Sequence, residues 1–101
     1  MDIKIPKTIK IGGFDYTIEI NPEQDRELQS NNNYGECAHD LRRIRFRSNL
    51  SEPQFAASFL HETLHAVDGI YCNYKLSEDE NSQLSNGLFQ VFEQLGIRFV
   101  R

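Results

Sequence analysis

The sequence predicts an α+β fold in which a small antiparallel sheet packs on two antiparallel helices. Apolar residues alternate along two stretches of the N-terminal half, as they do in strands with one buried face. Apolar residues then recur at helical spacing from Glu52 to about Tyr71, and again in the segment that follows Ser77. A chain of 101 residues is long enough for one domain with one modest core, so residues 1–101 are expected to form a single domain.

The N-terminal half is expected to form two β-hairpins. The alternating runs 3–11 and 14–20 flank Gly12-Gly13, a pair that is typical of a two-residue hairpin turn. A polar stretch follows, in which residues 23–28 could form a short helix. Residues 34–39 and 42–47 then form the second strand pair, with Ile44 and Phe46 on the buried face and the arginines on the solvated face.

The C-terminal half is expected to form the two helices. Ser51-x-x-Gln54 and Ser77-x-x-Glu80 are capping-box patterns, each followed by apolar residues at helical spacing. The apolar stripe of the second helix is expected to face the first helix, and consists of Leu84, Leu88, Val91, Phe92 and Leu95. Gly96 suits the position just beyond the end of that helix, and the remaining residues are expected to be extended.

Charge and composition exclude several classes of function. A formal net charge of −4 argues against a general nucleic-acid binder, which normally carries a basic surface. No apolar run approaches the ~18 residues of a membrane span, and no apolar segment of a signal peptide follows Met1. We therefore expect a cytoplasmic protein that binds neither nucleic acid nor membrane, with Cys37 and Cys72 as free thiols.

The stretch His61-Glu62-Thr63-Leu64-His65 carries the strongest functional signal, because it reads H-E-x-x-H within the first predicted helix. Residues four apart lie on one helix face, so the two imidazoles can bind one Zn²⁺. Glu62 flanks the same place and can accept a proton from a zinc-bound water. The pattern therefore predicts a zinc-dependent hydrolase, with a peptidase favoured. The alternative is a pair of polar histidines on a solvated helix face.

A catalytic zinc normally takes three protein ligands, and the third is expected from outside the HExxH turn. Asp68 is better placed to orient a histidine than to bind the metal, and Cys72 is expected to be a core thiol. Glu80 is in phase with the apolar stripe that should face the first helix, so it is the predicted third ligand. Its alternative role is to complete the capping box begun by Ser77. Glu78 and Asp79 are expected to point away from that stripe and to suit the positive N-terminal end of the helix.

These residues resemble the gluzincin type of zincin metallopeptidase, and within it the small ImmA/IrrE-related group encoded by phages and mobile elements. The resemblance rests on the HExxH motif followed by Glu80-x-x-x-Leu84-Ser85, and more loosely on Gly35-x-Cys37-x-His39. It implies a minimal zincin fold with His61, His65 and Glu80 as zinc ligands and Glu62 as the catalytic acid–base.

The same resemblance implies a protein or peptide substrate, because relatives cleave repressors of the helix-turn-helix class, and a location in the host cytoplasm if the chain is phage-encoded. Two alternatives stay open: a non-catalytic phage accessory protein that keeps a structural zinc, and a zinc hydrolase of a non-peptide substrate. The sequence leaves the oligomeric state open, and also the choice of oxyanion donor among His39, Tyr34, Tyr71 and Tyr74.

Overall fold

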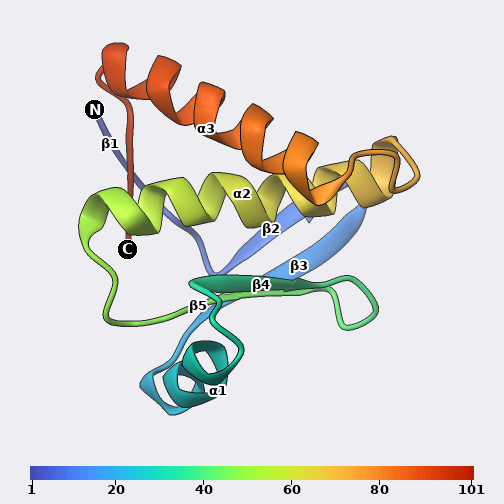
Figure 1. Cartoon of the computed structure of the whole chain (residues 1–101), viewed down its shortest axis with the longest axis horizontal. Coiled ribbons are helices and arrows are strands. Elements are labelled where there is room, and N and C mark those ends of the chain that lie inside the picture. Colours follow the sequence, from blue (N-terminus) through green and yellow to red (C-terminus); the bar gives the residue numbers. More distant parts are fainter.

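The structure, a computed structural model, describes the whole chain from Met1 to Arg101 and arranges it in three layers (Figure 1). A four-stranded sheet forms the first layer, helix α2 (Glu52–Tyr71) lies across one face of the sheet, and helix α3 (Glu78–Gln94) packs on α2. The two helices run in opposite directions, as the short connection between them requires. The predicted α+β class is confirmed. No helix combines the length and the apolar character that a membrane span needs.

The sheet is mixed rather than antiparallel, which corrects the prediction. Its strands are β2 (Thr8–Ile11), β3 (Phe14–Ile20), β4 (Gly35–Ala38) and β5 (Arg43–Phe46), in the order β2-β3-β5-β4. Both predicted hairpins form, and Gly12 and Gly13 make the first turn with φ values of 59° and 86°. However, β3 and β5 pair in parallel.

The segment between the two hairpins explains the parallel pair. It holds a 3₁₀ turn (Pro22–Gln24) and helix α1 (Asp25–Ser30), which carry the chain past the end of β3 to the far edge of the sheet. There β4 runs back antiparallel to β3, and the hairpin returns β5 between them in the direction of β3. The two end strands, β1 (Asp2–Lys4) and β6 (Arg98–Val100), form a separate parallel pair.

The core lies between the sheet and α2. Aromatic rings from both layers meet there, and the ring centroids of Phe46 on β5 and Phe55 on α2 are 5.2 Å apart. The buried apolar cluster consists of Ile11, Tyr16, Ile44, Phe46, Leu50, Phe55, Phe59 and Ala66. Each fully buried large side chain of this kind contributes about 1.5–3 kcal/mol, and together they fix α2 on the sheet.

Arg45 is buried, in contrast to the prediction, because α1 covers the face of β5 that was expected to be solvated. Its side chain is only 4 % exposed, and its guanidinium donates hydrogen bonds to Glu27 of α1 and Glu36 of β4 at 2.9 and 3.0 Å. Two carboxylates therefore pair with the buried cation, as such burial requires. This cluster joins α1 to strands β4 and β5.

Most of the predicted apolar stripe of α3 does not face α2, in contrast to the prediction; of its five residues only Phe92 is half-buried, with its ring centroid 5.7 Å from that of Phe99. The residues of α3 that are buried are Asn81 and Ser85, at 0 % and 1 % exposure. These small polar side chains allow the two helices to approach each other closely. The stripe is displaced by about a quarter turn toward solvent, and Leu84, Leu88 and Val91 are all more than 40 % exposed.

Candidate metal centre

Helix α2 positions both histidines of the motif. Ser51 begins the helix with a complete capping box, in which its side chain accepts from the backbone of Gln54 and the Gln54 side chain accepts from the backbone of Ser51. The helix then continues without interruption to Tyr71. Its i, i+4 geometry brings the Nε2 atoms of His61 and His65 within 3.2 Å of each other.

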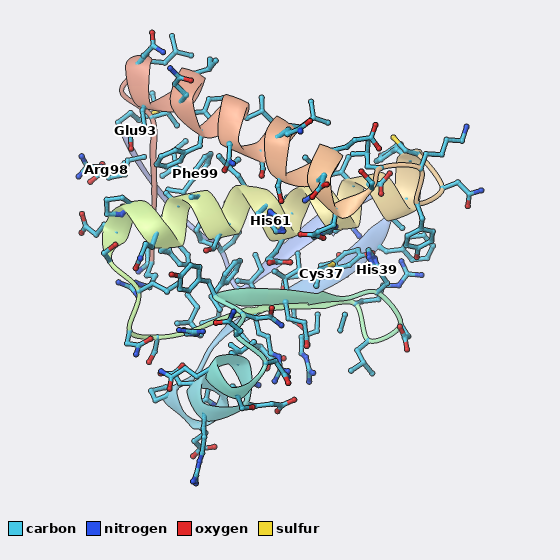
Figure 2. All side chains as sticks on the ribbon, in the orientation of Figure 1. Cys37, His39, His61, Glu93, Arg98 and Phe99 are labelled. Atoms are coloured by element: carbon cyan, nitrogen blue, oxygen red, sulfur yellow. The ribbon has the colours of Figure 1, made fainter.

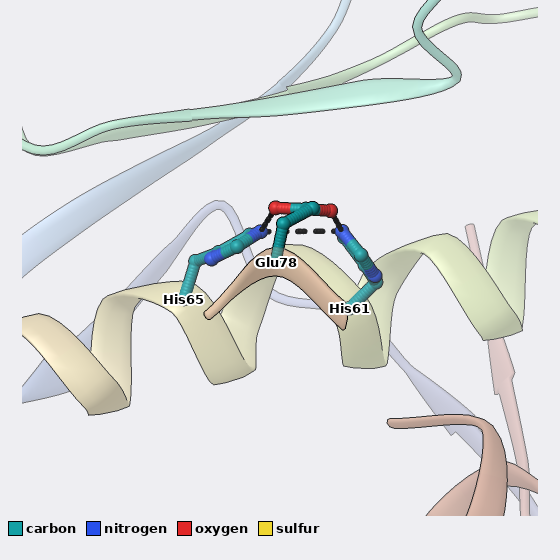
Figure 3. A group of neighbouring side chains, drawn as sticks. All are labelled: His61, His65 and Glu78. Carbon is teal, nitrogen blue, oxygen red and sulfur yellow. Dashed lines mark hydrogen bonds and ion pairs between the residues drawn. The ribbon is translucent and has the colours of Figure 1, made fainter. Parts of the chain in front are cut away.

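Glu78, in the first turn of α3, completes the group (Figure 3). One carboxylate oxygen lies 3.0 Å from Nε2 of His61, and the other lies 3.0 Å from Nε2 of His65. Both imidazoles are about three-quarters buried, whereas the Glu78 side chain is 67 % exposed. All three ligand atoms lie within 4.8 Å of one another. Two helices therefore aim two nitrogens and a carboxylate at one place.

The donor set and its spacing fit a divalent metal ion. Ligands of a four-coordinate zinc at ~2.0–2.1 Å are roughly 3.3 Å apart, close to the 3.2 Å between the two Nε2 atoms. Burial lowers the pKa of His65, although Glu78 acts against this, so the neutral imidazole that binds metals is favoured. Two histidines and one glutamate also leave a four-coordinate ion one free position, as catalytic zinc sites do.

Glu80, the predicted third ligand, has a different place in the structure. Its carboxylate accepts a hydrogen bond from the Ser77 backbone at 2.9 Å, and the hydrogen bonds with Ser77 hold its pKa below the ordinary value. Glu80 therefore completes the capping box, which was the alternative role. The sequence did contain a signal for Glu78, because Glu78, Asn81 and Ser85 share one helix face at spacings of three and four residues.

Two buried polar side chains hold the first turn of α3 against α2. The Asp68 carboxylate, 4 % exposed, accepts from the backbone N–H of Leu76 at 3.3 Å. The Asn81 side-chain amide donates to the backbone carbonyl of His61 at 3.1 Å. One contact lies just before Glu78 and the other just after it. Asp68 and Asn81 therefore fix the position of the backbone at Glu78, so that its exposed carboxylate meets the histidines.

Glu62 lies beside the donor group and is buried, at 8 % exposure. Its side chain passes close to Gly35 of β4, where an added Cβ would lie 3.1 Å from Cγ of Glu62 and 2.8 Å from the Phe46 ring. Burial, followed by the charges of Glu78 and Glu36, raises the pKa of Glu62 to about 8. A carboxyl group with such a pKa can both take up and release a proton near neutral pH.

A cavity of about 490 Å³ joins Glu62 and the donor group to strand β4. Cys37 of β4 and His39, in the turn that follows β4, lie between β4 and α2 (Figure 2) and line this cavity, with Sγ of Cys37 3.9 Å from Nδ1 of His39. Burial, then the charges of Glu62 and Glu36, raises the pKa of the Cys37 thiol to about 12. The thiol is therefore protonated at neutral pH, and Cys37 is not part of the donor group formed by His61, His65 and Glu78.

The other residues singled out from the sequence lie outside this cavity. Cys72 is exposed at the end of α2 rather than in the core, and both cysteines are free thiols. Of the four potential oxyanion donors, only His39 lines the cavity. Tyr34, Tyr71 and Tyr74 are all more than half exposed, and Tyr74 packs its ring against the edge of His39.

Comparison with known proteins identifies no relative: no protein-family model, curated protein or solved structure gives a significant match to this chain.

Proposed function

We propose that this chain is a zinc-dependent metallopeptidase that binds the ion through His61, His65 and Glu78. The observation that carries the proposal is the position of Glu62. It is a buried carboxyl group that lines the same cavity as the three donors. A structural zinc site gains nothing from a proton acceptor beside the metal, whereas hydrolysis requires one.

Each residue of the site then has a separate task. A bound zinc would lower the pKa of a coordinated water and polarise the carbonyl under attack. Glu62 accepts the proton of the attacking water and afterwards delivers it to the leaving amine. His39, the candidate donor that lines the cavity, stabilises the negative charge that develops on the carbonyl oxygen. Cys37 supports His39 through the contact between Sγ and Nδ1.

Strand β4 supports a peptide as the substrate. It is the last strand of the sheet and pairs only with β5, so the backbone groups on its other side are open to an extended chain. Three of its residues, Gly35, Glu36 and Cys37, line the cavity that holds Glu62. A substrate strand paired with β4 would pass beside Glu62. Since the ImmA/IrrE-related peptidases that the sequence resembles cleave helix-turn-helix repressors, such a repressor is the first protein substrate to test.

The test compares the wild-type protein with Glu62→Gln at equal zinc content, using an unfolded protein digest as a peptide library and mass spectrometry to detect new termini. We expect wild-type cleavage that a chelator abolishes and zinc restores. Glu62→Gln should keep its zinc and its fold but lose activity by at least about 10²-fold, the contribution typical of a general base. Cleavage by the variant at the wild-type rate would refute the role of Glu62.

A second candidate is a binding protein in which the metal is only a staple. One feature favours it: the exposed Glu78 comes from α3 while both histidines come from α2, so a bound ion would tie the two helices together. In this case zinc would raise the melting temperature, and neither the wild-type protein nor Glu62→Gln would cleave any peptide or repressor. The digest experiment therefore separates the two candidates.

A further inference from the structure

His39, the candidate oxyanion donor, is packed against the protein by one side of its imidazole ring. Its Nδ1 lies 3.9 Å from Sγ of Cys37. A Cβ added at Gly69 of α2 would lie 3.0 Å from Cε1 of His39 and 3.1 Å from its Nδ1. The Nδ1 side of the ring therefore faces β4 and α2, whereas Nε2 makes no hydrogen bond within the chain. Since the Cys37 thiol keeps its proton, it can donate to Nδ1, which leaves the ring proton on Nε2.

The ring of Tyr74 contacts a further side of His39. The two ring centroids are 4.9 Å apart, and the ring planes are nearly perpendicular, at 87°. Edge-to-face contacts of this kind are favourable beyond the burial of the rings themselves. His39 lines the cavity beside Glu62, whereas Tyr74 does not. Tyr74 therefore contacts the oxyanion donor without contacting the place where a substrate would lie.

A left-handed turn in the loop after α2 brings Tyr74 to this position. Asn73 and Tyr74 adopt φ values of 53° and 59°. The backbone N–H groups of Cys72 and Tyr74 both donate to the Asp68 carbonyl, at 2.9 and 3.2 Å, and hold the turn on the end of the helix. This backbone region is common for glycine and asparagine but unfavourable for a bulky residue such as tyrosine, and such strain is typical of functional sites. The contact of the ring with His39 explains why a tyrosine stands there.

Gly69 supplies an independent observation. Glycine is unfavourable within a helix, yet Gly69 lies in the last turn of α2. A Cβ added there would lie 2.9 Å from Cε1 of Tyr74, in addition to its close approach to the His39 ring. A residue without a side chain leaves room for both rings against the helix backbone. The helix is therefore less stable than it could be at the place where the two rings pack.

We propose that Tyr74 is a positioning residue that holds the imidazole of His39 with Nε2 directed to the cavity. The inference rests on the proposed function, in which His39 stabilises the negative charge on the carbonyl oxygen. An oxyanion donor is most effective when it is in place before that charge develops. The loop that carries Tyr74 continues into the first turn of α3, which carries Glu78. One segment therefore supplies a metal donor and also supports the oxyanion donor.

Steady-state kinetics of the zinc-loaded protein on a peptide that it cleaves test the proposal. Tyr74→Gly should lower kcat by about 10-fold, a part of the ~10²–10³-fold loss typical of removing an oxyanion donor, with KM and zinc content unchanged. Tyr74→Phe keeps the ring and should retain the wild-type kcat. Asn73→Gly is the matched control, because it makes the same change at the neighbouring left-handed residue, and it should also retain the wild-type kcat. Glycine suits a left-handed backbone, so thermal unfolding should show that both glycine variants are folded.

A double-mutant cycle shows whether Tyr74 acts through His39. In a His39→Ala background, Tyr74→Gly should cause no further loss of kcat, because the group that it positions is already absent. An equal loss with and without the His39 side chain would overturn the proposal, since Tyr74 would then act by another route. A wild-type kcat in Tyr74→Gly would overturn it as well.

A measurement that needs no catalysis separates this inference from the proposed function. Carbon-13 NMR relaxation at Cε1 reports the picosecond-to-nanosecond motion of the His39 ring, whether or not the protein is a peptidase. The ring should be rigid in the wild type and in Tyr74→Phe, and mobile in Tyr74→Gly. A ring that stays rigid in Tyr74→Gly would overturn the role of Tyr74. If the ring becomes mobile there but the wild type cleaves no peptide, the proposed function fails while the support of His39 by Tyr74 stands.

Discussion

The identity of the third metal ligand can be tested by removing each acidic side chain in the first turn of α3. Glu78→Ala removes the carboxylate that lies 3.0 Å from both histidine nitrogens. Glu80→Ala removes the carboxylate that caps the helix. Asp79→Ala removes an exposed carboxylate between them and so controls for the loss of one negative charge near the site. We expect zinc affinity to fall sharply in Glu78→Ala and only slightly in the other two.

The expected magnitude follows from the number of donors. Zinc binds structural sites of small domains with about 10–16 kcal/mol, so one donor of three or four accounts for roughly 3–4 kcal/mol, which is on the order of 10²–10³-fold in Kd. At a free zinc concentration of 100 times Kd, the wild-type protein gains about 2.7 kcal/mol of stability. For a domain of this size that gain raises the melting temperature by roughly 10–20 °C.

Two assays measure these effects on the same samples. Competition with a chromophoric zinc chelator gives Kd, and thermal unfolding with and without zinc gives the stabilisation. Glu80→Ala should lower the melting temperature of the zinc-free protein, because it loses half of the capping box, yet retain the rise with zinc. Glu78→Ala should lose most of that rise. Equal losses of affinity in the two variants, or a greater loss in Glu80→Ala, would refute the assignment of Glu78.

Further predictions follow from residues around the site. Asn81→Leu should weaken zinc binding by about 10-fold or more, as outer contacts of metal sites do, although every donor is intact; unchanged affinity in the chelator assay would contradict its positioning role. Asp68→Asn should bind zinc better than Asp68→Leu, since the amide oxygen can still accept from the loop backbone, and the same assay checks the order. Gly35→Ala should destabilise the protein by about 1–3 kcal/mol through overpacking, which denaturant unfolding would measure. It should also displace the Glu62 side chain, so kcat/KM should fall even when the variant and the wild type contain the same amount of zinc. Alkylation at pH 8 should modify the exposed Cys72 rapidly and the Cys37 thiol, whose pKa is about 12, at least ~100-fold more slowly until the protein is unfolded; two equally fast cysteines by mass spectrometry would contradict the burial of Cys37.

Local signals in the sequence predicted the elements that they themselves determine. The capping box at Ser51 and the helical spacing that follows it place α2 at Glu52–Tyr71, with the histidine pair on one face. The Gly12-Gly13 turn defines the first hairpin, because both residues adopt positive φ, and Gly96 ends α3 with a φ of 74°. In each of these cases the information lies within a few residues of the structure it determines.

Long-range contacts determine the features that the sequence did not predict. The parallel pairing of β3 with β5 depends on how α1 crosses the end of the sheet, and no local pattern encodes it. Arg45 lies on the polar face of its strand, but α1 and its carboxylates bury that face. The residue of α3 that meets the two histidines differs from the prediction for a related reason. The most apolar face of α3 was expected to meet α2, whereas Asn81 and Ser85 make that contact and bring Glu78, rather than Glu80, to the histidines.

A crystal structure of the zinc-loaded protein, with anomalous data collected at the zinc absorption edge, tests the central claim most directly. We expect one anomalous peak bounded by Nε2 of His61, Nε2 of His65 and the Glu78 carboxylate, with Glu62 beside it and not bound to it. A peak at Glu80 or at a cysteine, a peak that Glu62 itself ligates, or no peak between the two histidines would contradict the proposed site.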